Sequence, residues 1–70
     1  MAKYSSNMTL GQIMADPDMK AVVVKHMPNI EADHRYPMGL PYTLGTIKYE
    51  VDASLRAIFE EIITELNALE

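Results

Sequence analysis

Two copies of the pattern Thr-Leu-Gly-x-Ile, at residues 9–13 and 43–47, most constrain what this chain can fold into. Each threonine can cap a helix, because its hydroxyl accepts a hydrogen bond from a free amide of the first turn. In the first copy Gln12 completes a capping box, and Met8 and Ile13 have the spacing of a hydrophobic staple. In the second copy a threonine replaces the glutamine, so the reciprocal half of the box is missing. Both copies predict a helix that begins directly after the threonine.

Prolines and caps divide the first half into a short and a longer helix. The first helix ends at Ala15 or Asp16, because a residue before proline disfavours helical backbone. Asp16 can cap the second helix, since proline suits its first position, and Pro28 ends it. Three consecutive valines also fit a strand, but the cap and the helical spacing favour a helix. Its apolar face consists of Met19, Val22, Val23, His26 and Met27.

The second half repeats this plan after an irregular connection. Residues 29–41 show no periodicity and contain two prolines and a glycine, so we expect a connection that crosses the domain without regular structure. A short helix from residue 44 to about residue 51 follows, and Asp52 or Ser54 caps a longer helix to about residue 69. The long helix has one apolar stripe, made of Leu55, Ile58, Phe59, Ile62, Leu66 and Leu69.

These elements predict an all-α fold. We expect a compact four-helix domain over residues 8–70, short-long-short-long in order and packed as two helical hairpins. A flexible lead-in over residues 1–7 precedes it. Single glycines at 11 and 45 are expected to let helices approach closely. Seventy residues allow one domain with a thin core, because a chain this short buries only about 60% of its unfolded surface.

Composition excludes several classes of protein. The chain has no cysteine, which excludes disulfides, thiolate zinc sites and a thiol nucleophile. Six Lys and Arg residues against ten Asp and Glu residues give a net charge of −4, which argues against a nucleic-acid partner. No apolar run is long enough for membrane insertion. The start is too polar for a secretory signal, so we expect a cytoplasmic protein.

The sequence contains no recognisable catalytic motif. There is no ordered nucleophile–base–acid set and no glycine-rich phosphate loop, so we expect no enzyme activity and no cofactor. His26, His34 and Asp33 are the candidate metal ligands, since imidazole and carboxylate groups suit zinc or iron. The histidine spacing of eight matches no standard ligand pattern. A small-ligand or metal-binding regulator using His26 and His34 is nevertheless the alternative function.

An apolar surface is the leading candidate site. Six methionines are many for this length, and methionine suits both irregular core gaps and adaptable binding surfaces. We expect Met19 and Met27 to fill the core. The predicted interaction surface consists of Met14, Tyr36, Met38, Leu40 and Tyr42.

The helix boundaries resemble those of a known family. The relevant segments are TLGQIMADP at residues 9–17, KAVV at 20–23, KHMP at 25–28 and ELNAL at 65–69. They resemble the small helical module often appended to the C-terminus of bacterial glycoside hydrolases and esterases. The resemblance implies an accessory role in docking or oligomerisation, without chemistry of its own. We therefore expect a non-catalytic interaction module whose partner is a hydrolase-like protein or a second copy of the chain.

Overall fold

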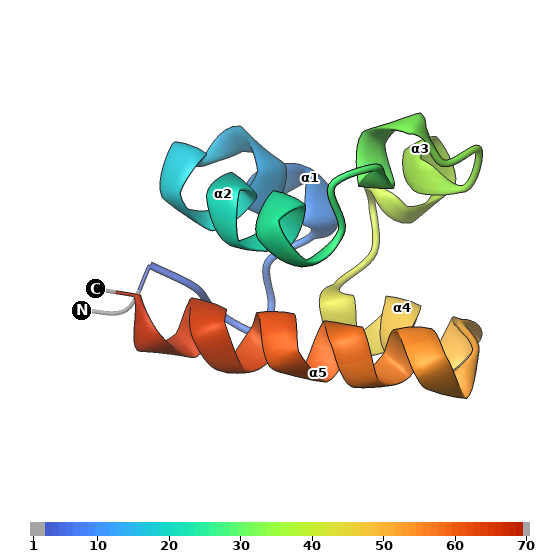
Figure 1. Ribbon diagram of the computed structural model, residues 1–70. Helices are drawn as coiled ribbons and strands as arrows, with labels where there is room; N and C mark the ends of the chain where they lie inside the picture. The colour runs from blue at the N-terminus through green and yellow to red at the C-terminus, as the bar shows by residue number, and fades with distance from the viewer. Residues whose placement is uncertain (1–2, 70) are drawn as a thin grey trace.

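Helices account for the regular structure of the chain over residues 3–69, the part that the computed structural model describes (Figure 1). The elements in chain order are α1 (Leu10–Ala15), α2 (Pro17–His26), a 3₁₀ helix (Ile30–Ala32), α3 (Tyr36–Gly39), α4 (Leu44–Glu50) and α5 (Ala53–Ala68). The predicted all-α fold is confirmed. The four expected helices are α1, α2, α4 and α5, in the predicted short-long-short-long order.

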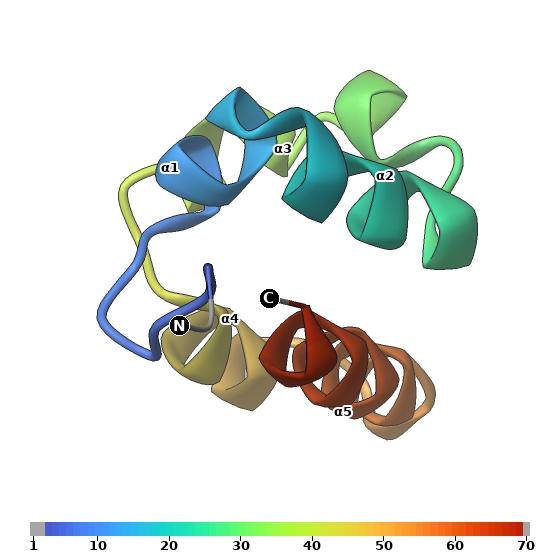
Figure 2. The same cartoon turned by 90° about the vertical axis from the view of Figure 1, so that its left-hand side faces the viewer.

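The helices form two layers, and the chain crosses between them twice (Figures 1 and 2). One layer holds α1, α2 and α3, and the other holds α4 and α5. The two crossing segments meet at an isolated antiparallel bridge between Thr9 and Thr43. The Leu10 amide donates to the Tyr42 carbonyl at 2.9 Å, and the Gly11 amide donates to the Leu40 carbonyl at 3.0 Å. The two repeated helix starts therefore lie side by side.

The predicted caps fix where these helices begin. Thr9 Oγ1 accepts from the Gln12 amide at 3.2 Å, and Gln12 Oε1 accepts from the Thr9 amide at 2.9 Å, which completes the capping box. Thr43 Oγ1 accepts from the Thr46 amide at 3.3 Å. Asp16 caps α2 by accepting from two amides of the first turn. Asp52 occupies the N-cap position of α5 without a side-chain hydrogen bond, and Ser54 lies inside that helix.

The core lies between the layers, where α2 packs against α5. Most of its residues belong to the apolar faces that the sequence predicts for these two helices, and no polar or charged side chain of residues 3–69 is buried with them. The buried residues are Tyr4, Leu10, Ile13, Met19, Val22, Val23, Ile30, Leu44, Phe59, Ile62 and Leu66. Met19 fills the core as expected, whereas Met27 is only half-buried.

The lead-in predicted over residues 1–7 contains a residue of the core, Tyr4, while residues 1–2 lie outside the described part of the chain. The Tyr4 side chain belongs to the core, with only 7% of the residue exposed. Lys3 Nζ lies 2.6 Å from an Asp18 carboxylate oxygen and 3.6 Å from one of Asp16. A single buried ring among polar neighbours produces no periodicity, so the sequence pattern did not reveal this anchor.

The connection predicted over residues 29–41 is more regular than expected. Its first part forms the 3₁₀ helix, with Ile30 buried, and its second part forms the single turn of α3. Asp33 joins the two, because its Oδ1 accepts from the Arg35 amide at 2.8 Å. Short helices of this kind carry no amphipathic repeat, so local hydrogen bonds rather than periodicity determine them.

Candidate docking groove

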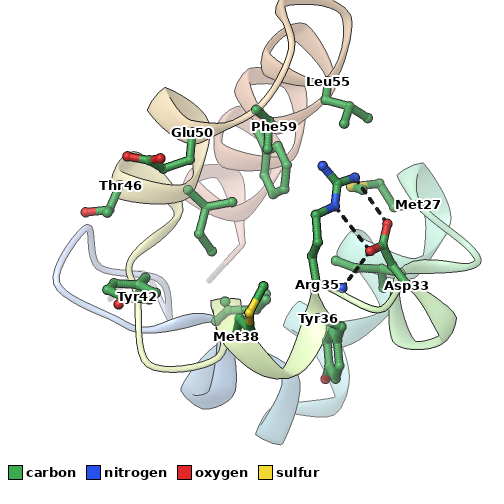
Figure 3. Close-up of a pocket in the computed structure, with 15 residues that line it drawn as sticks. Met27, Asp33, Arg35, Tyr36, Met38, Tyr42, Thr46, Glu50, Leu55 and Phe59 are labelled. Atoms are coloured by element: carbon green, nitrogen blue, oxygen red, sulfur yellow. Dashed lines mark hydrogen bonds and ion pairs between the residues drawn. The ribbon is translucent and has the colours of Figure 1, made fainter.

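An open groove of about 750 Å³ lies between the two layers (Figure 3). One wall comes from the 3₁₀ helix and α3, and the other comes from α4 and the first turns of α5. Both walls are mainly apolar. The apolar lining residues are Leu10, Met27, Ile30, Tyr36, Met38, Tyr42, Ile47, Val51, Leu55 and Phe59.

The groove exposes apolar surface that the small core does not cover. Met38 and Tyr42 are 65% and 53% exposed, although both line the groove. Phe59, at 3% exposure, also lines it and belongs to the core. The apolar surface is therefore continuous from the core out to side chains that are open to solvent.

Charged groups border this apolar surface. Arg35 Nη2 lies 3.2 Å from Asp33 Oδ2, and Arg35 Nε donates to Asp33 Oδ1 at 3.3 Å. The bidentate hydrogen bond from Arg35 holds the pKa of Asp33 below its usual value. Glu50 lines the groove from the α4 side, and no described side chain forms a hydrogen bond or ion pair with it.

The structure brings together three of the five residues predicted as an interaction surface. Tyr36, Met38 and Tyr42 line the groove. Met14 and Leu40 do not line it, and both are half-buried and packed against the core. The carbonyl of Leu40 is held by the Gly11 amide, which keeps this residue close to α1.

The opposite wall was not predicted as part of a site. In the sequence, Leu55 and Phe59 stand out only as part of the apolar stripe of the last helix, and Ile47 only as the last residue of the repeated Thr-Leu-Gly-x-Ile pattern. The stripe is longer than the surface that α2 covers. The first turns of α5 lie beneath α3 instead of α2 (Figure 1), so they remain open on that side, which only the arrangement of the layers reveals.

The candidate metal ligands do not form a metal site. His26 Nε2 lies 2.7 Å from Glu65 Oε1, and its Nδ1 lies 3.6 Å from Glu61 Oε2. The His34 side chain is 88% exposed and lies 3.7 Å from Asp33. Among residues 3–69, no three His, Asp or Glu side chains are grouped so that they could hold a metal ion. The set His26, Asp33 and His34 is therefore wrong as a metal centre.

His26 instead belongs to a polar contact between the layers. Lys25 Nζ donates to both carboxylate oxygens of Glu65, at 3.0 and 3.2 Å. The hydrogen bonds from Lys25 and from His26 hold the pKa of Glu65 below its usual value. Lys25 and His26 are the last two residues of α2, and Glu65 lies on α5. This contact therefore ties the two long helices together.

No helix over residues 3–69 combines the length and the apolar character that a bilayer crossing requires.

Comparisons with protein-family models, curated proteins and solved structures find no match to this chain. The likeness to appended hydrolase modules therefore stays a prediction, and the groove is the feature from which function can be inferred.

Proposed function

We propose that this chain is a non-catalytic interaction module that docks a protein partner, or a second copy of itself, through the groove. The observation that carries the proposal is the exposure of Met38 and Tyr42 beside an apolar surface continuous with the core. Contiguous exposed apolar patches of this kind mark interaction sites in small proteins. Covering the groove would remove this surface from water and would add to a core that is thin in a chain of this length.

The polar groups of the groove support a binding role without catalysis. Asp33 and Arg35 neutralise each other at short distance, so neither is free to act as an acid or a base. Catalysis generally uses titratable groups that are held in a water-excluding site, and the groove is open to solvent between its walls. The likeness to appended modules adds a hydrolase-like protein as the class of partner.

Two exposed tyrosines provide a matched test of this proposal. Tyr42 lines the groove, whereas Tyr49 is 77% exposed and does not line it. Tyr42→Ser and Tyr49→Ser therefore make the same chemical change inside and outside the site. Met38→Glu places a charge in the groove as a stronger variant. Circular dichroism of each variant checks that the helices remain folded.

The measurements are sedimentation velocity of the purified chain and affinity isolation of its partners from the source cell. We expect Tyr49→Ser to keep the dimer, or the same identified partners, that the unmodified chain forms. We expect Tyr42→Ser and Met38→Glu to lose them. Association that survives both groove substitutions, or a chain that stays monomeric and retains no partner, contradicts the proposal.

A further inference from the structure

The charges around the groove are mostly negative. Asp33 and Glu50 line it, on opposite walls. We call Asp33 and Glu50 the acidic rim. Arg35 is the one basic side chain among the described lining residues and it pairs with Asp33, so the excess negative charge of the rim is that of Glu50.

The nearby basic side chains do not neutralise this excess. Lys48 Nζ lies 3.8 Å from Glu60 on α5, and Arg56 donates to the Lys48 carbonyl at 3.2 Å. Both side chains are directed to partners that do not line the groove. Glu50 therefore remains available to a positive charge supplied from outside.

The walls of the groove favour a helical occupant. An extended peptide gains its affinity by pairing with a free strand edge, and residues 3–69 contain no strand that could offer one. Amphipathic helices bind instead in apolar grooves, where large side chains repeated on one face fill the space between the walls. Met27 and Met38, one at the end of α2 and one on α3, give the groove the unbranched side chains that adapt to such faces.

Charge distinguishes a foreign partner from a second copy. Each copy carries a net charge of −4, so self-docking would bring negative charge toward the acidic rim. A partner with lysine or arginine beside its apolar face has the complementary charge. On the basis of the proposed docking function, we propose that the groove binds an amphipathic helix of a partner protein, with basic side chains that meet the acidic rim.

Designed peptides test this inference on the full chain. The probe is a fluorophore-labelled amphipathic peptide of about 15 residues, long enough to form a helix on binding. It has leucines on one face and lysines flanking them. A second peptide replaces the lysines with glutamates, and a third is proline-rich with the same net charge as the first. Fluorescence anisotropy measures the affinity of each.

We expect the basic helical peptide to bind about tenfold or more tightly than the acidic one, with an affinity that falls as salt is added. Glu50→Lys should reverse or abolish this preference. Glu61→Lys is the matched control, because it changes the net charge of the chain equally from an exposed position outside the groove. We expect Glu61→Lys to retain most of the preference. Met38→Glu should abolish binding of the basic peptide.

Four outcomes overturn the inference: equal binding of acidic and basic peptides, tighter binding of the proline-rich peptide, equal effects of Glu50→Lys and Glu61→Lys, or no binding at all. A dimer that Tyr42→Ser disrupts would also overturn it, because a second copy would then occupy the groove. If any of these outcomes is seen while Tyr42→Ser still abolishes the association measured for the proposed docking function, only the identity of the partner is wrong. If Tyr42→Ser affects no association, the docking function fails as well.

Discussion

Thr9 and Thr43, the N-caps of α1 and α4, face each other in an antiparallel bridge at the point where the chain crosses between its two layers. The two copies of the repeated pattern are thus joined by backbone pairing as well as similar in sequence. Each threonine also accepts a hydrogen bond from an amide of the helix that it caps. Each of these threonines therefore sets the start of a helix and also contributes to the contact between the two crossing segments.

Removing either cap should destabilise the domain. We expect Thr9→Ala and Thr43→Ala each to lower the free energy of unfolding by about 1 kcal/mol, because an amide of the first turn loses its acceptor. Thr64→Ala is the control. Thr64 lies in the interior of α5 and donates to the Glu60 carbonyl, and alanine is the better helix former there. Urea unfolding followed by circular dichroism measures all three, and a Thr64→Ala loss as large as the other two would contradict this role.

The glycines at the second helical positions should respond differently to alanine. A Cβ at Gly11 would lie 3.3 Å from the Leu40 carbonyl oxygen, whereas at Gly45 the nearest atom would be Thr43 Oγ1 at 4.0 Å. Neither glycine has a positive φ. We expect Gly45→Ala to stabilise the domain by about 0.5 kcal/mol or more, and Gly11→Ala to be about 1 kcal/mol less favourable than Gly45→Ala. Equal effects in thermal unfolding would show that α1 has room to move away from Leu40.

Tyr4 should behave as a core residue. We expect Tyr4→Ala to lower the free energy of unfolding by about 3 kcal/mol, because a large buried ring is lost and a cavity remains. Tyr49→Ala should change it by less than about 0.5 kcal/mol, because Tyr49 is exposed. Denaturant unfolding of both variants decides the matter. Similar small effects would show that the segment before α1 is a loose lead-in after all.

Acid should weaken the contact between α2 and α5. The pKa of Glu65 is lowered in the folded chain by its hydrogen bonds with Lys25 and His26, from an ordinary value of 4.5. Its stabilisation is therefore present above about pH 4.5 and is lost as the pH falls through the lower, folded-state pKa. We expect Glu65→Gln to reduce the melting temperature at pH 7 and to flatten the decrease toward pH 3.

Glu50→Gln is the matched control for this experiment, because no described side chain pairs with Glu50. We expect the melting temperature of Glu50→Gln to follow that of the unmodified chain between pH 7 and pH 3. An unchanged acid profile in Glu65→Gln would show that other carboxylates, such as Asp16 and Asp33 with their lowered pKa values, account for the loss.

The helices could be predicted because their signals are local. The capping box at Thr9 and the Asp16 cap before Pro17 each act within four residues. The hydrogen bonds that set these helix boundaries can therefore be predicted from the sequence alone. The apolar stripe that includes Phe59, Ile62 and Leu66 repeats every three or four residues, which specifies a helix with one buried face. Tyr4 has no such neighbours, so its place in the core could not be predicted.

The sequence by itself determined that this protein is helical, where three of its four main helices begin and which faces the two long ones bury, because caps and periodicity act over a few residues. Only the tertiary structure decided that Leu55 and Phe59 would lie across an open groove from Tyr36 and Met38, and that His26 would meet Glu65 instead of His34. Those contacts join residues far apart in the chain. They depend on how two layers of helices are stacked, and no local pattern encodes that arrangement.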